Sequence, residues 1–374
     1  MTASASAPAA GERYFAEQAP RLAELCHRLS ERFADGGRLV AFGAGEVERS
    51  DARHVAVEFV HPVIVGKRAL PALAVEPGDV ALLARPEDVA IAFGGGAAIA
   101  RAVAVARERG CLTVAFVDDA GAEWAFVPPT ADPFVAQELV ETTYHVLWEL
   151  VHVFFEHRSR AGRDAGASSF LYPFLATGAD HGQDLEAVLA DVAASVLAKG
   201  RETAALRAQT VEEGAATLAA AAAALRSRLD GGGLVLALGN GGSATDAMDA
   251  VADLRAGGRR ALDLTADPAI LTAIANDVGT EAIFARQVIA YGSVGDALLA
   301  FSTSGNSTNV IAALAEARRR GLLTVAFVGY DGGRVLAEGL ADHVVVSRSE
   351  HIPRIQEAQA TAWHVLRAST EGAR

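Results

Sequence analysis

Short apolar runs alternate with longer stretches rich in Ala, Leu, Arg and Glu along most of the chain. An uninterrupted apolar run is typical of a strand buried on both faces of a parallel sheet. The longer stretches repeat their apolar positions every three to four residues, as amphipathic helices do. The alternation predicts an α/β fold of βαβ units, with helices on both faces of a parallel sheet. The candidate strands of the C-terminal half are residues 234–238, 261–265, 297–302, 323–328 and 343–346.

Helical stretches precede the strands of each half. Residues 16–33 form the first stretch, and an Ala-rich run at 185–229 forms the second. We expect the Ala-rich run to be a helical hairpin that breaks near Val211–Gly214. Five strands after such helices suit a flavodoxin-like, doubly wound domain.

The two halves of the chain repeat each other. Three segments recur in the same order: GGRLVAFGAG (36–45) and GGLVLALGNG (232–241), CLTVAFV (111–117) and LLTVAFV (322–328), QELVETTYHVL (137–147) and QEAQATAWHVL (356–366). The offset between the matched segments grows from 195 or 196 to 211 and then to 219. Chance matches of short apolar runs would not stay collinear, so the pattern indicates a duplicated domain.

The chain has 374 residues, more than the roughly 100 to 200 typical of one domain. With 51% hydrophobic and 21% charged residues it can bury a sizeable core, which excludes a disordered protein. The segment HRSRAGRDAGASS (157–169) is charged and rich in Gly and Ser, as linkers are. We therefore predict a first domain at 12–156, a linker at 157–180 and a second domain at 181–374.

The formal net charge is −13, which disfavours broad contact with the phosphates of nucleic acids. Two cysteines, Cys26 and Cys111, cannot build a disulfide framework or a metal-type Cys set. The N-terminal residues lack a basic and apolar leader pattern, and no uncharged apolar stretch of about 18 residues occurs. We expect a soluble, cytoplasmic protein that binds neither nucleic acid nor a membrane.

The segment FSTSGNSTNVIAAL (301–314) predicts a strand that runs into a polar turn and then a helix. Ligands of open α/β sheets bind at the carboxyl ends of strands, where a helix N-terminus offers free N–H groups to a phosphate. An ordinary N-cap needs only one Ser or Thr, whereas this turn has four hydroxyls. They belong to Ser302, Thr303, Ser304 and Ser307. The turn therefore favours a phosphate site, and the second such turn, GNGGSATDAM (239–248), adds Asn240 and Ser243.

These turns, together with AIANDVG (273–279) and RIQE (354–357), resemble the phosphosugar-binding SIS (sugar isomerase) domain family, and within it the phosphoheptose isomerase branch. The resemblance is strong over residues 185–370 and weak over 15–156. It implies two tandem flavodoxin-like SIS domains. It also implies ketose–aldose isomerisation through an enediol, with D-sedoheptulose 7-phosphate converted to D-glycero-D-manno-heptose 7-phosphate. The resemblance implies a bound divalent metal as well, and Zn²⁺ suits N and O ligands.

The family pattern has a His and a Glu four residues apart on the helix after the GNGGS turn, and a Gln and a His eight apart on the C-terminal helix. The second copy keeps Gln356 and His364 but carries Asp249 and Asp253 at the other two positions. Asp in place of Glu shortens the reach of a base by about 1.5 Å, which is costly for proton transfer. In the ND segment, Asp277 is a candidate partner for sugar hydroxyls.

The first copy shows the reverse pattern, because it keeps the reactive positions. His54 and Glu58 lie four residues apart, and Gln137 and His145 lie eight apart. Each pair alone is more typical of a solvated helix face or a packed core His. All four together favour a catalytic or metal-binding role.

The phosphate turns of the first copy are lost. STSGNS is replaced by AFGGGA (92–97), which has no hydroxyl, and GNGGS is replaced by GAGEVE. Glu46 and Glu48 would set negative charge against a phosphate. The helix that contains the ND segment in the second copy is largely deleted in the first.

These complementary losses lead to the hypothesis of a composite site, with phosphate held by the second copy and the sugar carbonyl faced by the first. Glu58 is then the base that moves the proton, and His145 is its acid/base partner or a metal ligand. The candidate substrate-binding residues are Asn240, Ser243, Asp277, Ser302, Thr303, Ser304, Ser307 and Gln356. The candidate metal ligands are His54, Glu58, Gln137 and His145, and the candidate catalytic residues are Glu58, His145 and His364.

Two alternatives stay open. One is a site in the second copy alone, run by Asp249, Asp253, Gln356 and His364. The other is a non-catalytic phosphosugar sensor or adaptor. In all three cases we expect Tyr144 and Trp363, each directly before a matched His, to be packing residues. Isologous pairing is the commonest mode of assembly, so we also expect a homodimer that mimics a four-domain SIS tetramer.

Overall fold

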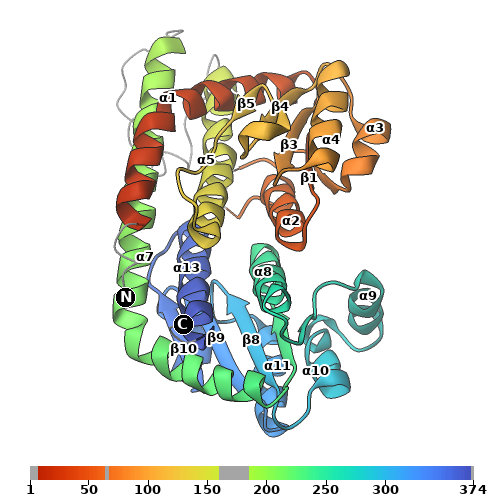
Figure 1. Ribbon diagram of the computed structural model, residues 1–374, viewed down its shortest axis with the longest axis vertical. Coiled ribbons are helices and arrows are strands. Elements are labelled where there is room, and N and C mark those ends of the chain that lie inside the picture. Colours follow the sequence, from red (N-terminus) through yellow and green to blue (C-terminus); the bar gives the residue numbers. More distant parts are fainter. Residues whose placement is uncertain (1–6, 64–66, 160–184, 372–374) are drawn as a thin grey trace. The chain divides into compact units, whose positions relative to one another are not determined.

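The computed structural model describes residues 7–63, 67–159 and 185–371 (Figure 1). The chain divides into two compact units, Met1–Ala204 and Ala205–Arg374, and each contains one five-stranded parallel sheet. The predicted α/β class with two tandem flavodoxin-like domains is therefore confirmed.

The sheet of unit 1 has the strand order β2-β1-β3-β4-β5, the flavodoxin-like order. Its strands are β1 (Leu39–Gly43), β2 (Ala72–Val75), β3 (Val89–Phe93), β4 (Leu112–Ala115) and β5 (Trp124–Ala125). Its helices are α1 (Ala7–Ala34), α2 (Glu46–Val60), α3 (Val80–Leu83), α4 (Ala97–Glu108) and α5 (Pro133–Ser159). All residues of β1, β3 and β4 are buried, as uninterrupted apolar runs predict.

The core of unit 1 forms two layers, one on each face of the sheet. One layer joins the sheet to α1, α2 and α5, and it includes Trp148 and Phe59. The other joins the sheet to α3 and α4. Helix α2 is therefore held by its apolar side against the sheet, and this fixes where its polar residues point.

The sheet of unit 2 has the order β10-β9-β8-β6-β7, the same topology as that of unit 1. Its strands are β6 (Val235–Leu238), β7 (Ala261–Asp263), β8 (Ala297–Ser302), β9 (Leu323–Gly329) and β10 (His343–Ser347). Its helices are α8 (Gly242–Ala256), α9 (Pro268–Asp277), α10 (Ala285–Tyr291), α11 (Thr308–Arg319), α12 (Gly333–Ala337) and α13 (Ile352–Glu371). All five predicted strands are present, with ends that differ by at most two residues.

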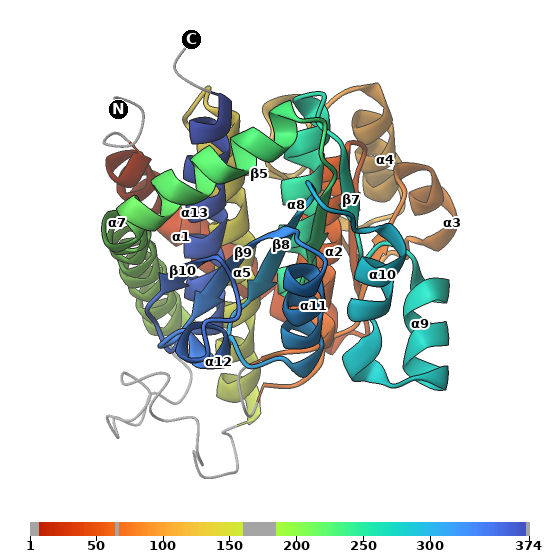
Figure 2. The same ribbon diagram turned by 90° about the horizontal axis from the view of Figure 1, so that it is seen from below.

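Helices also cover both faces of the second sheet. The long helix α7 (Leu185–Asp230) packs with α8 and α13 on one face, whereas α10, α11 and α12 cover the other (Figure 2). The strand order reverses between β6 and β8. The turns that follow these two strands therefore flank the switch point where ligands of such sheets bind.

The predicted helical hairpin is wrong, because α7 is one helix of 46 residues that crosses the division between the units. Gly214 costs a helix only about 1 kcal/mol relative to Ala, and the flanking residues are strong helix formers. Of the predicted linker, residues 157–159 end α5 and the rest lies outside the described residues. The domain boundaries stay a prediction.

A buried carboxylate supports the first strand of each sheet. Asp88 accepts hydrogen bonds from the backbone N–H groups of Arg38 and Arg85 and pairs with the Arg38 guanidinium at 2.7 Å. Asp296 accepts from the N–H groups of Leu234 and Ser293 in the same way. The shared arrangement supports the duplication, and a short match that contains it, DVAIAF and DALLAF, is readable in the sequence.

Replacing Asp88 with Asn is expected to destabilise unit 1 by about 2 to 4 kcal/mol at pH 7, because Arg38 loses its buried partner. The hydrogen bonds and charge of Arg38 hold the pKa of Asp88 below its usual value, against the effect of burial. Its contribution is therefore complete above the unfolded-state pKa of about 4 and lost as the pH falls further. Urea unfolding of wild type and variant should show a gap that closes in acid. The exposed Asp79→Asn is the control, and a gap equally large at pH 3 would contradict the assignment.

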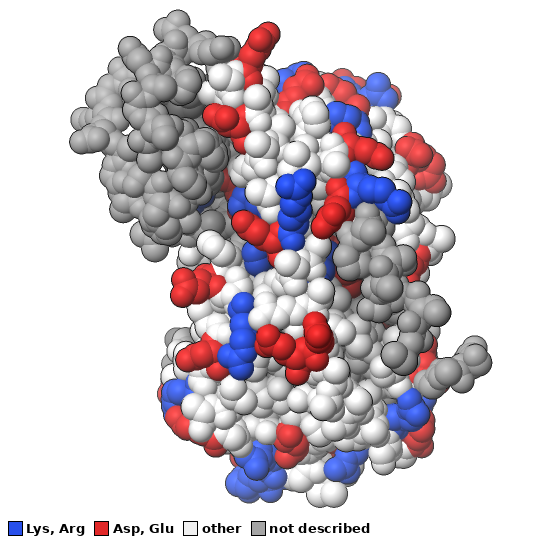
Figure 3. All heavy atoms as spheres, turned by 90° about the vertical axis from the view of Figure 1, so that its left-hand side faces the viewer, with Lys and Arg blue, Asp and Glu red and all other residues white. Residues whose placement is uncertain are grey.

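Acidic and basic side chains are interspersed over the described part of the face drawn in Figure 3. Within the described ranges, no helix is long and apolar enough to cross a membrane. The expectations of a cytoplasmic location and of no contact with nucleic acid stay predictions.

Candidate functional site

The two polar turns of unit 2 each lead into the N-terminus of a helix. Helix α8 follows Gly241 and helix α11 follows Ser307, and neither N-cap residue makes a side-chain capping hydrogen bond. The alternative explanation for the hydroxyls of this turn is an ordinary helix N-cap, and Ser307 does not act as one. The Ser243 and Ala244 N–H groups donate to backbone carbonyls of the turn before α8, and the Val310 N–H donates to Asn309 Oδ1. The positive dipole end of each helix, beside the sheet switch point, can attract an anion.

The hydroxyls of the turn after β8 keep a proton to donate. Ser302 Oγ accepts from the Gly305 N–H at 3.2 Å, and Ser304 Oγ accepts from the Asn306 N–H at 3.1 Å. A hydroxyl that accepts from the backbone can still donate its own proton. Thr303 is half-buried in the same turn. The turn thus combines hydroxyl donors with a helix N-terminus, as a phosphate requires.

The two turns are joined by a pair of amides. Asn240 Nδ2 donates to Asn309 Oδ1 at 2.9 Å, and Asn309 Nδ2 donates back to Asn240 Oδ1 at 2.8 Å. Asn240 therefore positions the turns, and Asn309 is a residue that the sequence analysis missed. Its only sequence signal is its place in the first turn of the helix after STSGNS. Ser243 is buried in the first turn of α8.

Backbone hydrogen bonds from the end of β9 and from α12 hold the turn after β8. The Gly329 N–H donates to the Thr303 carbonyl at 2.9 Å, and the Val335 N–H donates to the Gly305 carbonyl at 3.1 Å. Gly305 has φ +61°, and a Cβ at this position would collide with the Gly332 carbonyl oxygen. The sequence STSG thus encodes a turn held in one shape by backbone contacts.

An open pocket of about 770 Å³ adjoins this turn at the carboxyl ends of β9 and β10. Its lining residues are Ser304, Asn306, Tyr330, Asp331, Arg348, Ser349 and Glu350. Tyr330 has φ +52°, the one non-Gly residue in the described ranges with a positive φ. Asp277, by contrast, accepts from its neighbour Asn276 at 2.7 Å and forms no hydrogen bond to either turn in the described part of the chain.

In unit 1, three of the four predicted reactive residues converge. His54 and Glu58 lie on α2, His145 lies on α5, and at most 2% of each is exposed. His54 Nε2 is 3.2 Å from His145 Nε2 and 3.9 Å from Glu58 Oε1. One ligand atom from each lies within 4.8 Å of the others. These atoms could hold a metal ion or pass a proton. Gln137 is half-buried on α5 and forms no hydrogen bond with them among the described residues.

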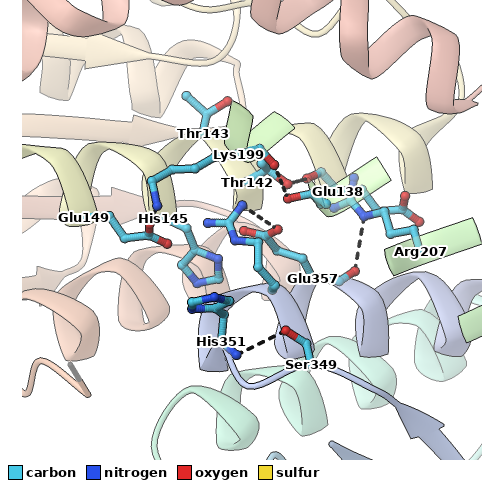
Figure 4. Close-up of polar contacts among 12 residues, drawn as sticks. Glu138, Thr142, Thr143, His145, Glu149, Lys199, Arg207, Ser349, His351 and Glu357 are labelled. Carbon is cyan, nitrogen blue, oxygen red and sulfur yellow. Dashed lines mark hydrogen bonds and ion pairs between the residues drawn. The ribbon is translucent and has the colours of Figure 1, made fainter. Parts of the chain in front are cut away.

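Burial controls the charge of this cluster. It raises the pKa of Glu58 to about 7, an effect that His145 opposes and Glu149 reinforces. Burial, with His145, also holds the pKa of His54 well below its usual value, so that this imidazole is neutral. Glu58 Oε2 accepts no hydrogen bond within the described residues. Glu149, one turn beyond His145 on α5, pairs with Lys199 of α7 (Figure 4).

The expectation that Tyr144 is only a packing residue is wrong. Its hydroxyl lies 2.9 Å from His54 Nδ1 and also donates to Asp51 Oδ1 at 3.5 Å. Burial, with Glu48, raises the pKa of Asp51 well above its usual value, and the Tyr144 hydrogen bond opposes this. Neither residue could be recognised from spacing, because each acts through a contact between α2 and α5.

The corresponding positions of unit 2 are arranged differently. Trp363 Nε1 donates to Asp253 Oδ2 at 2.7 Å, so Trp363 does more than pack, contrary to expectation. Burial raises the pKa of Asp253, while His364 and the Trp363 hydrogen bond oppose this. Gln356 and His364 are buried on α13. Asp253, which aligns with Glu58, thus accepts a hydrogen bond from the Trp363 indole.

In unit 1 a glutamate side chain lies at the turns that correspond to the two polar turns of unit 2. The Glu48 side chain lies against Gly43, Gly45 and Gly94, and a Cβ on Gly94 would lie 2.7 Å from Glu48 Cγ. Ser243 takes the same position in unit 2, where its atoms lie against Gly239. A carboxylate at this place repels a phosphate, in agreement with the charge predicted for this turn.

Known proteins match these features. A family model described as "SIS domain" matches residues 200–329, which include both polar turns. The phosphoheptose isomerase of Pelodictyon phaeoclathratiforme is 43% identical over 170 residues, which cover 43% of this chain and 80% of that protein. The chain belongs to the SIS domain family. A second phosphoheptose isomerase, from Paramagnetospirillum magneticum, is 42% identical over 175 residues, which cover 42% of this chain and 90% of that protein.

Solved structures match nearly the whole chain in fold. Tagatose-6-phosphate ketose/aldose isomerase from Escherichia coli matches with a TM-score of 0.58 and 14% identity, covering 99% of this chain and 92% of that one. The C-terminal domain of glucosamine-fructose-6-phosphate aminotransferase from Francisella tularensis matches with a TM-score of 0.59 and 10% identity, covering 95% and 93%. At these identities the matches show a shared fold and nothing more.

Proposed function

We propose that this SIS protein is a sugar-phosphate isomerase, and more specifically that it converts D-sedoheptulose 7-phosphate to D-glycero-D-manno-heptose 7-phosphate. Relatives named phosphoheptose isomerase, 42% to 43% identical over most of their own length, support the reaction class. The observation that carries the proposal is the buried cluster of His54, Glu58 and His145. A protein that only binds phosphosugars has no need of two imidazoles and a carboxylate in one buried place.

The isomerisation needs only proton movements. Glu58 takes the proton from C1 of the ketose, while the oxygen on C2 gains a proton, and an enediol forms. The proton returns to C2 as the oxygen on C1 loses its own, which leaves the aldose. Glu58 Oε2 is the oxygen suited to this transfer, because Oε1 faces His54 and Oε2 accepts no hydrogen bond from the described residues. His145 serves the sugar oxygens.

The donor set of the cluster fits a divalent ion such as Zn²⁺. Ligand atoms about 2.0 to 2.1 Å from a tetrahedral ion lie about 3.3 Å apart, close to the 3.2 Å between the nitrogens of His54 and His145. These two residues and Glu58 would hold the ion, with Gln137 as the fourth proposed ligand. The chemistry supplied by such an ion is Lewis-acid polarisation of a sugar oxygen.

We further propose that the two copies divide the work. The polar turns of unit 2 bind the phosphate, and the cluster of unit 1 moves the proton. Two features support this division: Glu48 fills the corresponding place in unit 1, and Asp253 is engaged by Trp363 in unit 2. The composite site, its contacts from Asp277, Gln356 and His364, and the homodimer stay predictions.

Incubation of the purified protein with sedoheptulose 7-phosphate, with and without added Zn²⁺, tests the proposal. We expect the aldose heptose 7-phosphate to accumulate to an equilibrium mixture, which gas or liquid chromatography of the dephosphorylated sugars can quantify. Tight binding of the phosphosugar without conversion under either condition would instead identify a sensor or adaptor. Conversion of a shorter ketose phosphate alone would keep the reaction class and replace the substrate.

A further inference from the structure

Tyr144 is placed to control the ring of His54. It lies on α5 directly before His145, is 1% exposed, and meets the His54 ring edge-on at a centroid distance of 5.2 Å. Its hydroxyl is 2.9 Å from His54 Nδ1, and the opposite ring nitrogen, Nε2, faces His145 and Glu58. The two nitrogens of His54 therefore have separate partners.

We propose that Tyr144 is a positioning residue that presents His54 Nε2 to the metal, and this inference rests on the proposed metal site. A neutral imidazole has one N–H and one lone pair. If Nδ1 donates to the Tyr144 oxygen, the lone pair belongs to Nε2, which is the nitrogen that faces the cluster. The Tyr144 O–H then donates to Asp51 Oδ1, which is buried behind it. The chain of donors runs from His54 through Tyr144 to Asp51.

Such outer contacts tune metal ligands in general, because they fix which nitrogen is free and stop the ring from turning. Tyrosine suits the position since its hydroxyl accepts from one neighbour and donates to another. The second copy provides the contrast. There Trp363 stands in the place of Tyr144 and faces the carboxylate of Asp253, to which an indole can only donate. Trp363 thus bonds to the residue at the place of Glu58, whereas Tyr144 bonds to His54, one helical turn earlier.

The test is the affinity of Tyr144→Phe for Zn²⁺, measured by competition with a chromophoric chelator on the full chain. The variant keeps the ring and removes the hydroxyl, and we expect its affinity to fall by about 10-fold to 100-fold. Tyr14→Phe is the matched control. Tyr14 is an equally buried tyrosine of unit 1 whose hydroxyl bonds to the Phe126 carbonyl and to Thr143, away from His54.

An affinity of Tyr144→Phe equal to that of wild type and Tyr14→Phe would overturn the inference and leave the metal site standing. Failure of the wild type itself to bind Zn²⁺ would overturn the metal site and the inference with it. Should Tyr144→Phe not fold, Asp51→Ala decides, because it removes the outer acceptor and keeps the tyrosine. In either variant a positioning role also predicts a lower kcat with KM for the phosphosugar nearly unchanged, which lost packing alone would not give.

Discussion

Glu58→Gln is expected to lower kcat for sedoheptulose 7-phosphate by about 10²-fold to 10⁴-fold, the range of a lost general base. Glutamine has nearly the shape of glutamate, so the packing of α2 should persist, but its amide cannot accept the C1 proton. The proposed phosphate turns lie in the other copy, and so the affinity for the phosphosugar should change little. Steady-state kinetics and calorimetric binding with the same preparation measure both quantities.

The duplication supplies a matched control for this variant. Asp253 occupies the place of Glu58 in the second copy, and Asp253→Asn keeps an oxygen that can accept from Trp363. We expect this control to retain the kcat of the wild type. Activity that survives Glu58→Gln but disappears in Asp253→Asn would reverse the assignment and select a site within the second copy alone.

Removing two hydroxyls from the turn after β8 is expected to weaken phosphosugar binding by at least about 10²-fold. In Ser304→Ala with Ser307→Ala, two donors to a dianion are lost, and each such hydrogen bond contributes about 1.5 to 3 kcal/mol. The backbone contacts that shape the turn come from Gly329 and Val335 and remain. Titration calorimetry with the sugar phosphate, and with inorganic phosphate as the smaller probe, measures the loss.

Thr272→Ala is the control for this double variant. The Thr272 hydroxyl is exposed and donates to the Pro268 carbonyl within α9, so its removal should leave binding unchanged. An unchanged affinity of the double variant for both probes would contradict the phosphate assignment. A loss for the sugar phosphate alone would place these hydroxyls on the sugar instead.

The repeated strands could be predicted because their evidence is local. Runs such as LLTVAFV are apolar except for one threonine, and such runs are typical of strands buried on both faces of a sheet. The break in the Ala-rich helix was mispredicted for an equally physical reason. Gly214 is a weak signal on its own, and in the structure a Cβ at this position would lie 3.5 Å from the Val345 side chain of β10. Contacts between a helix and a distant strand cannot be predicted from the local sequence.

The residues of the candidate site also differ in whether the local sequence reveals them. His54, Glu58 and His145 were recognisable because a repeat and a family pattern aligned them, and the structure brings them together. The role of Tyr144 was mispredicted, and Asp51 and Asn309 were missed, because each makes its contact across two helices or two turns. The role of Tyr144 depends on His54, about 90 positions away, so the sequence around Tyr144 carries no pattern that predicts it.

The Glu48 side chain that lies over the glycines of unit 1 has a consequence for how the chain responds to its ligand. This carboxylate is part of the fold and repels a phosphate, so we expect the phosphosugar not to bind at the corresponding turns of unit 1. Under the proposed division of work, the phosphosugar then saturates one site per chain among the described residues, that of unit 2. Its binding curve within one chain is a simple hyperbola, and any sigmoidal response must arise from the coupling of separate chains.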